Sequence, residues 1–154
     1  MRAWRLVQAR YAAGALDGEG ARLFGGRWNS RGTRMVYLSD SPALAALEIL
    51  VHTRSPEDLA SYLLLAVDFP EDHLMRLGHH ELPEGWNDLM PGAAAQAVGD
   101  RWTADGNSLA LAVPSAVVPQ QSNFLLNPEH HAWSELQVSE PEPFFFDPRL
   151  ADRS

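Results

Sequence analysis

The pattern of apolar and polar positions predicts strands in four parts of the chain. The clearest are 34–38 (RMVYL), which alternates strand-forming residues, and 61–69 (SYLLLAVDF), a continuous apolar run that indicates a buried strand. Pro70 ends the second run. Segments 3–9 and 108–113 have the same mixture of strand-forming residues. We therefore expect a β-sheet as the core.

Helical signals are concentrated at one boundary. Ser41 is a favourable N-cap and Pro42 suits the first helical position, so they predict a helix that runs to about Thr53. At 100° per residue this helix has one apolar arc, formed by Leu44, Leu47, Leu50 and Val51. Glu48 lies at the edge of that arc. The alanine-rich part of 86–104 predicts a second helix.

Strands and helices alternate irregularly, and the sequence has no internal repeat, low-complexity segment or interdomain linker. This pattern predicts an α/β (α+β) fold rather than an all-α one. With 154 residues, one domain over 1–154 is the expectation, with a core at about 3–148.

Composition narrows the possible chemistry. The absence of cysteine excludes a disulfide framework, a thiolate nucleophile and a cysteine zinc site. The first ten residues lack the apolar run of a signal peptide, and the longest apolar run, 63–67, is too short to span a membrane. We therefore expect a cytoplasmic protein. A net charge of −8 argues against a nucleic-acid binder, because affinity for nucleic acid comes from basic residues that neutralise phosphates.

The charge is unevenly distributed. Residues 1–34 hold seven arginines and two acids, a formal +5, and the remainder is −13. All twelve basic residues are arginine, which the codon bias of a GC-rich bacterium would explain, but that bias does not explain the clustering. An arginine-rich lobe on an acidic body suits a small anion, since the guanidinium fork matches phosphate. Arg5, within the first predicted strand, is either a solvated strand charge or an arginine directed into a cleft.

A glycine pair lies at the centre of this basic region. Gly25 and Gly26 allow a backbone turn that approaches a ligand closely and presents successive N–H groups to an anion. Arg22 and Arg27 flank the pair, and Trp28 follows, so we predict substrate contacts from Arg22, Gly26, Arg27 and Trp28. A capped turn with a packed tryptophan is the alternative. Neither a Walker A loop nor a GxGxxG fingerprint is present.

Further polar candidates each have a structural alternative. Tyr37 shares a strand face with Met35 and is either core or a stacking platform. Glu48 is either an exposed helix charge or an acid at the mouth of a cleft. Ser122 and Asn123 precede a short apolar run and could contact substrate, with Ser115 as a competing serine; neither serine lies in a G-x-S-x-G elbow. The histidines at 73, 79 and 80 show no metal-ligand pattern, so we expect no metal.

Three segments taken together resemble a known family. GARLFGGRWNSRG at 20–32, VYLSDSPALAALEILVH at 36–52 and VPSAVVPQQSNFLLNPEH at 113–130 are similar to the RES domain, which is named for its Arg, Glu and Ser. The resemblance covers roughly residues 3–148. It implies a fold like that of ADP-ribosyltransferase toxins, with a mixed β-sheet core, flanking helices and a cleft for NAD.

The resemblance also implies roles for individual residues. The family's catalytic residues fall on Arg27, Tyr37, Glu48 and Ser122, with Ser115 the less favoured serine. Glu48 would stabilise the positive charge that develops on ribose, and Arg27 with Arg5 would bind the pyrophosphate. Tyr37 would stack on the substrate and the serine would position it.

The implied function is that of the toxin of a bacterial type II toxin–antitoxin pair. Family members consume NAD by cleaving the nicotinamide–ribose bond, as glycohydrolases or phosphorylases, and some ADP-ribosylate a protein. Water, inorganic phosphate and a protein side chain all remain open as acceptors. The expected partners are an Xre-like antitoxin and a second copy of the chain, without nucleic acid or membrane. The alternatives are a mono-ADP-ribosyltransferase and a non-catalytic partner-binding module.

Overall fold

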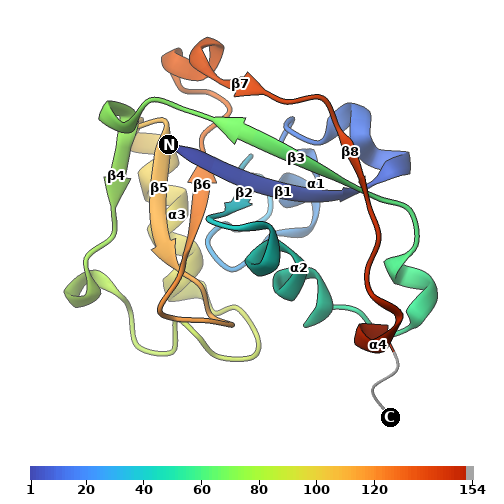
Figure 1. Cartoon of the computed structure of the whole chain (residues 1–154). Helices are drawn as coiled ribbons and strands as arrows, with labels where there is room; N and C mark the ends of the chain where they lie inside the picture. The colour runs from blue at the N-terminus through green and yellow to red at the C-terminus, as the bar shows by residue number, and fades with distance from the viewer. Residues whose placement is uncertain (152–154) are drawn as a thin grey trace.

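The computed structural model describes residues 1–151, which form one mixed β-sheet with helices on its faces (Figure 1). The strands are β1 (Arg2–Gln8), β2 (Val36–Ser39), β3 (Tyr62–Asp68), β4 (Leu74–Arg76), β5 (Ala110–Pro114), β6 (Ser122–Leu126), β7 (Gln137–Val138) and β8 (Glu142–Phe144). The α-helices are α1 (Glu19–Phe24), α2 (Pro42–Leu50), α3 (Ala93–Asp105) and α4 (Pro148–Ala151). The predicted α+β class is confirmed.

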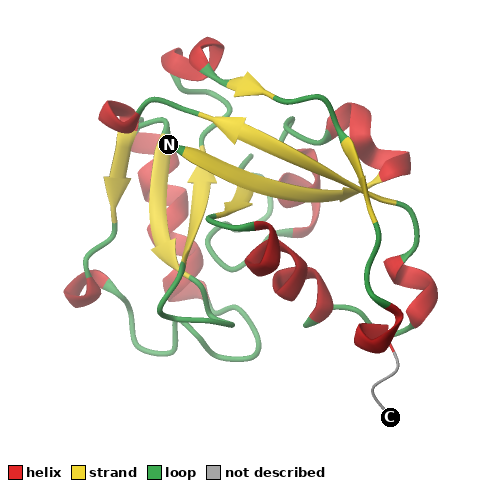
Figure 2. Ribbon diagram, viewed as in Figure 1, coloured by secondary structure: helices red, strands yellow, loops and turns green. Residues whose placement is uncertain are grey.

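The sheet has the strand order β4-β5-β6-β2-β1-β3-β7, and β8 adds to β3. The β4–β5 pair is parallel and the remaining pairs are antiparallel. In Figure 2, the long β1 and β3 cross the view while β5 and β6 run nearly upright, so the sheet is strongly curled. A single bridge, Trp4 to Ser39, joins β1 to β2 and marks the point where the two halves of the sheet meet.

The two faces of the central strands pack into separate cores because successive side chains of a strand point to opposite sides. Val36, Leu38 and Phe124 belong to one cluster. Met35 and Leu125 belong to the other, where Trp102 of α3 covers them and Tyr37 packs at its margin. Figure 1 shows α3 behind the β5–β6 pair. Met35 and Tyr37 therefore lie on the same face of the sheet, as the alternation predicts.

Helix α2 begins as the sequence predicts. The Ser41 side chain accepts a hydrogen bond from the Leu44 N–H, and Pro42 occupies the first turn. The helix ends earlier than predicted, at Leu50. The predicted apolar arc is partly wrong, because Leu47 and Val51 are 39% and 54% exposed.

The buried face of α2 is shifted relative to the predicted arc: Leu44 and Leu50 are buried as predicted, and Ala45 and Ala46 take the place of Leu47 and Val51. Ala45 and Ala46 cluster with Leu6 of β1 and Tyr62 of β3, and their small side chains bring the helix close to the sheet. This close approach places the next turn of α2, with Glu48, near the ends of the central strands. In Figure 1, α2 lies beside β1 and below it in the view.

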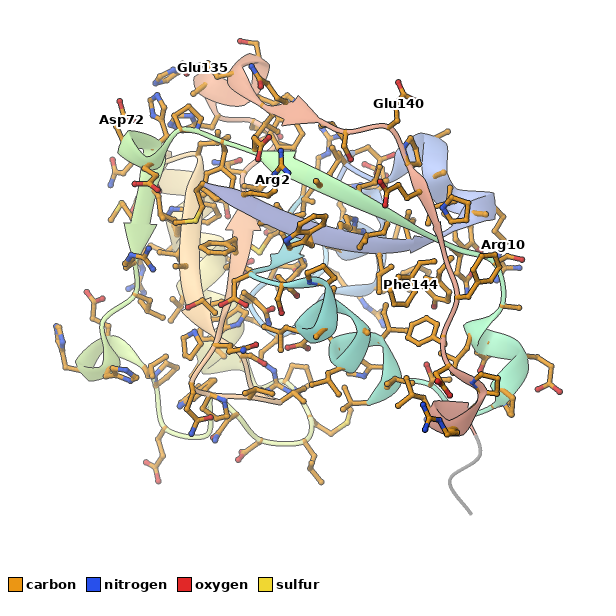
Figure 3. All side chains as sticks on the ribbon, in the orientation of Figure 1. Arg2, Arg10, Asp72, Glu135, Glu140 and Phe144 are labelled. Carbon is orange, nitrogen blue, oxygen red and sulfur yellow. The ribbon has the colours of Figure 1, made fainter. Side chains whose placement is uncertain are left out.

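The four predicted strands correspond to β1, β2, β3 and β5, and the alanine-rich segment forms α3. The sequence analysis did not predict β6, β4, β7 or the six-residue α1. The phenylalanine triplet at 144–146 begins at the end of β8, and Phe144 is labelled in Figure 3. Phe144 and Phe146 pack against the cluster of Leu6 and Tyr62, and Phe145 is 84% exposed. Within residues 1–151, no helix combines the length and apolarity needed to cross a membrane.

Candidate functional site

Glu48 is held by two polar groups, one directly after β5 and the other at the start of β6. Its Oε1 accepts a hydrogen bond of 2.7 Å from Ser115 Oγ and one of 2.8 Å from Asn123 Nδ2. Its Oε2 receives no hydrogen bond from a residue that the structure describes. The side chain is half-buried. One carboxylate oxygen is thus fixed to the protein and the other is left to interact with a ligand.

The loop after β5 fixes the direction of the Ser115 hydroxyl. Ser115 is fully buried, and its Oγ accepts hydrogen bonds from the N–H groups of Val117 (3.0 Å) and Val118 (3.1 Å). Because these two donors occupy the oxygen lone pairs, the hydroxyl hydrogen is directed to Glu48. Ser115 therefore acts as a donor to this carboxylate.

Ser122 and Asn123 point in different directions although they are adjacent at the start of β6. Asn123 lies opposite Ser39 in the ladder and reaches Glu48 on the same face. Ser122 lies opposite Pro114, and its backbone N–H donates to Asp40 Oδ2 at 3.0 Å. Since neighbouring strand residues face opposite sides, the structure brings Ser115, and not Ser122, to Glu48.

Tyr37 is held in a buried network with the turn at Arg27-Trp28-Asn29, here called the RWN turn. Its hydroxyl donates to Asn29 Oδ1 at 2.6 Å and accepts from the Trp28 N–H at 3.0 Å. Gly26 lies against this hydroxyl, because a Cβ on Gly26 would be 2.6 Å from the oxygen. Burial raises the pKa of the Tyr37 phenol well above its ordinary value, so the hydroxyl stays protonated at neutral pH.

Trp28 and Asn29 are structural parts of this turn. Trp28 is 2% exposed and stacks on Trp86 with ring centroids 6.2 Å apart. Asn29 is fully buried, and its amide nitrogen donates to the carbonyl groups of Ala21, Ser30 and Thr33. The packed-turn interpretation of RWN therefore describes these two side chains. The predicted anion-binding backbone is not formed, because the N–H groups of Gly25 and Gly26 donate to the carbonyl oxygens of Ala21 and Asn29. Arg27 is left as the group of this turn that is able to reach a ligand.

Two arginines of the basic region contact neutral groups. Arg27 Nη1 donates to the carbonyl oxygens of Trp86 and Asp88, each at 2.9 Å. Arg5 Nη1 donates to the Tyr37 carbonyl at 2.9 Å, and its buried Nε has no partner among residues 1–151. Burial lowers the pKa of Arg5 below its usual value. Neither guanidinium is hydrogen-bonded to a carboxylate of the described chain, so both keep positive charge for an anion.

Other arginines of the region are already paired. Arg22 forms a 2.9 Å ion pair with Glu19 on α1, and Arg34 contacts the same carboxylate at 3.6 Å. Arg2, seen in the centre of Figure 3, pairs with Asp68 at 2.8 Å. Arg22 therefore makes no hydrogen bond within the network of Tyr37 or that of Glu48. Because these arginines are paired, the formal charge of +5 on residues 1–34 overstates the charge available to a ligand.

The two networks share strand β2. Tyr37 and Ser39 lie two residues apart on the same face, and they lead to the RWN turn and to Glu48 respectively. Ser39 Oγ donates to Asn123 Oδ1 at 2.8 Å. Sequence reasoning missed Ser39 and the Ser115–Glu48 contact, because these partners are separated by 84 and 67 residues and no local pattern signals them.

Two other features of the molecule lie outside the hydrogen-bond networks of Glu48 and Tyr37. A cavity of about 560 Å³ is lined by Asp17, Arg34 and Trp133 among others. His73 forms a 3.2 Å pair with Glu135, which is labelled near the top of Figure 3. Across residues 1–151, no three histidine or carboxylate side chains are arranged to hold a metal ion.

Comparisons with known proteins show the family of the chain. The model of the RES domain matches residues 2–147. The chain is 37% identical over 151 residues to Toxin Res of Yersinia enterocolitica, which covers 97% of this chain and 99% of that protein. It is 34% identical over 152 residues to the Prs ADP-ribosylating toxin of Sphingobium sp., covering 96% and 94% of the two chains.

A solved structure shows the same fold at low sequence identity. It is the crystal structure of the M. tuberculosis MbcT–MbcA toxin–antitoxin complex, with a TM-score of 0.77 and 23% identity. The match covers 94% of this chain and 84% of that one. With the family model matching nearly the whole chain and relatives above 30% identity over nearly their full lengths, this protein belongs to the RES domain family.

Proposed function

We propose that this chain is the toxin of a toxin–antitoxin pair and that it cleaves NAD at the bond between nicotinamide and ribose. Relatives named as toxins, matched over 99% and 80% of their own lengths, support the first part. The relative named as an ADP-ribosylating toxin supports NAD as the substrate, since ADP-ribosylation takes its ADP-ribose from NAD. The observation that carries the chemistry is Glu48, with Oε1 anchored to Ser115 and Asn123 and Oε2 directed to no group of the described chain.

Bond cleavage requires stabilisation of charge. When the C–N bond breaks, its electron pair leaves with nicotinamide and positive charge develops on the ribose. A fixed carboxylate beside the ribose stabilises that charge, as carboxylates do in glycoside cleavage. In this proposal Glu48 Oε2 accepts from the 2′-hydroxyl and faces the developing oxocarbenium ion.

Arg27 and Arg5 are the proposed pyrophosphate ligands. Arg27 uses Nη1 to hold the loop at Trp86 and Asp88, and its Nε and Nη2 groups remain as donors for phosphate oxygens. Gly26 lets the turn pack directly against the Tyr37 hydroxyl, since a Cβ there would lie 2.6 Å from that oxygen. Tyr37 presents its ring as a wall of the site while its hydroxyl holds the turn.

The serine of the proposed site is Ser115. Its donation to Glu48 favours it over Ser122, whose backbone is engaged with Asp40. Ser115 would orient the carboxylate rather than attack the substrate. The acceptor for ADP-ribose would be water, inorganic phosphate or a protein side chain.

An incubation with NAD tests the reaction and identifies the acceptor. The purified chain is mixed with NAD with and without inorganic phosphate, and products are identified by mass. ADP-ribose without phosphate indicates hydrolysis, and ADP-ribose-1″-phosphate formed with phosphate indicates phosphorolysis. Intact NAD in both reactions and in cell lysate would contradict the proposal.

A protein-modifying reaction is the second candidate. It is favoured by the Sphingobium relative, whose name states that it ADP-ribosylates. NAD labelled in the ADP-ribose part would then label a protein in cell lysate, and a Glu48→Gln variant would not. We further propose an antitoxin as the partner of this chain, because its solved structural neighbour is a toxin–antitoxin complex.

A further inference from the structure

Ser39 ends strand β2 beneath the Glu48 site and is 5% exposed. It pairs with Asn123 in the β2–β6 ladder, so the two side chains share one face of the sheet. Its Oγ donates to Asn123 Oδ1 at 2.8 Å. Asn123 in turn donates from Nδ2 to Glu48 Oε1 at 2.8 Å. Ser39 is therefore linked to the Glu48 carboxylate through one intervening side chain, that of Asn123.

The direction of each hydrogen bond in this chain is fixed by the carboxylate. An ionised glutamate accepts hydrogen bonds and cannot donate them, so Asn123 must present its NH₂ group to Glu48. The amide oxygen of Asn123 then faces Ser39, and the Ser39 hydroxyl must donate. A serine hydroxyl can donate or accept in isolation, but at this position one direction is compatible with the carboxylate.

We infer that Ser39 is a positioning residue for Glu48, acting by locking the orientation of the Asn123 amide. Ser115 is locked in the corresponding way by the N–H groups of Val117 and Val118. Both locked donors converge on Oε1, which leaves Oε2 directed to the ribose. The inference rests on the proposed function for what Glu48 does, and on the hydrogen bonds alone for how Glu48 is held.

Replacing Ser39 by alanine leaves Asn123 Oδ1 without its donor. The amide is then held by its bond to Glu48 alone, so Asn123 moves more freely and its hydrogen bond to Glu48 Oε1 is weakened. We expect Ser39→Ala to lower kcat for NAD cleavage about tenfold, the factor that corresponds to one buried hydrogen bond. We expect KM for NAD to change by less than about twofold, because Ser39 contacts no substrate.

Three comparisons separate positioning from general stability. Ser39→Thr keeps the hydroxyl and should restore most of kcat. Ser108→Ala is the matched control, since Ser108 is 2% exposed and bonds to Trp102 and the Ala110 carbonyl, away from Glu48. It should lower the unfolding temperature without lowering kcat. In an Asn123→Ala background, Ser39→Ala should add less than about a twofold loss, because the residue through which it acts is gone.

The inference is overturned if Ser39→Ala keeps the wild-type kcat in a folded protein, or if its loss is equally large in the Asn123→Ala background. A readout independent of activity is the side-chain amide signal of Asn123 in ¹H–¹⁵N spectra. It should shift in Ser39→Ala and stay in place in Ser108→Ala. If the wild type leaves NAD intact, the proposed function fails, and an unmoved amide signal would then separately refute the role of Ser39.

Discussion

Replacing Glu48 by glutamine removes its charge while keeping its shape. The amide oxygen of glutamine can accept the two hydrogen bonds that Ser115 and Asn123 donate to Oε1. No buried donor loses its partner, so the free energy of unfolding should change by less than about 1 kcal/mol. The side chain then offers an NH₂ group in place of Oε2, and it can neither stabilise the positive ribose nor accept from its 2′-hydroxyl.

The expected effect on catalysis is large. Removing one fixed electrostatic group from a transition state typically costs about 3–4 kcal/mol, so Glu48→Gln should lower kcat by two to three orders of magnitude. Glu48→Ala is the useful contrast. It also leaves the Ser115 and Asn123 donors unpaired, at about 1–3 kcal/mol for each buried group, so it should lower the unfolding temperature as well.

The assay is the initial rate of NAD loss at saturating NAD, alongside thermal unfolding of each variant. The control is Glu57→Gln, an exposed glutamate in the 56–59 turn, which should match the wild type in both measurements. The reasoning is refuted if Glu48→Gln keeps kcat within about threefold of the wild type while it unfolds at the same temperature.

Three further predictions test other parts of the account. Arg27→Ala should raise KM for NAD at least about tenfold in initial-rate measurements, because a charged hydrogen bond to phosphate is worth about 1.5–3 kcal/mol, and an unchanged KM would remove Arg27 from the pyrophosphate site. Gly99→Ala should unfold at a much lower temperature, since its Cβ would collide with the Trp28 carbonyl oxygen, and a wild-type melting curve would contradict this packing. Burial, followed by the neighbouring His131 and His73, lowers the pKa of His130 below its ordinary 6.5, so the unfolded chain binds a proton more readily. The free energy of unfolding should be highest above pH 6.5 and fall as the pH drops toward the lowered pKa of His130 in the folded protein. His130→Asn should reduce this loss of stability between pH 8 and pH 5 in unfolding curves, and an equal loss in both proteins would count against the prediction.

Local signals predicted the elements that local physics determines. The cap at Ser41 with Pro42 fixes the start of α2 because the hydrogen bond spans three residues. The alternation at 34–38 places Tyr37 with Met35 because strand periodicity needs no distant partner. The short α1 escaped prediction because its six residues follow a glycine cap and carry little apolar periodicity.

The site depends on contacts that no local pattern encodes. Glu48 could be placed at the edge of a helix, but its bonds to Ser115 and Asn123 arise from the order of β2, β6 and β5 in the sheet. The choice between Ser115 and Ser122 depends on strand parity, and the start of β6 was not predicted. The apolar arc of α2 was partly wrong for the same reason, since the sheet contacts Ala45 and Ala46 and leaves Leu47 exposed.

Release of free nicotinamide is the most direct test of the central claim, because every acceptor gives the same leaving group. The purified chain and its Glu48→Gln variant are each incubated with NAD, inorganic phosphate and cell lysate, and nicotinamide is quantified by mass. The account predicts nicotinamide release by the wild type that is at least about a hundredfold faster than by the variant. No release by the wild type, or equal release by both proteins, would contradict it.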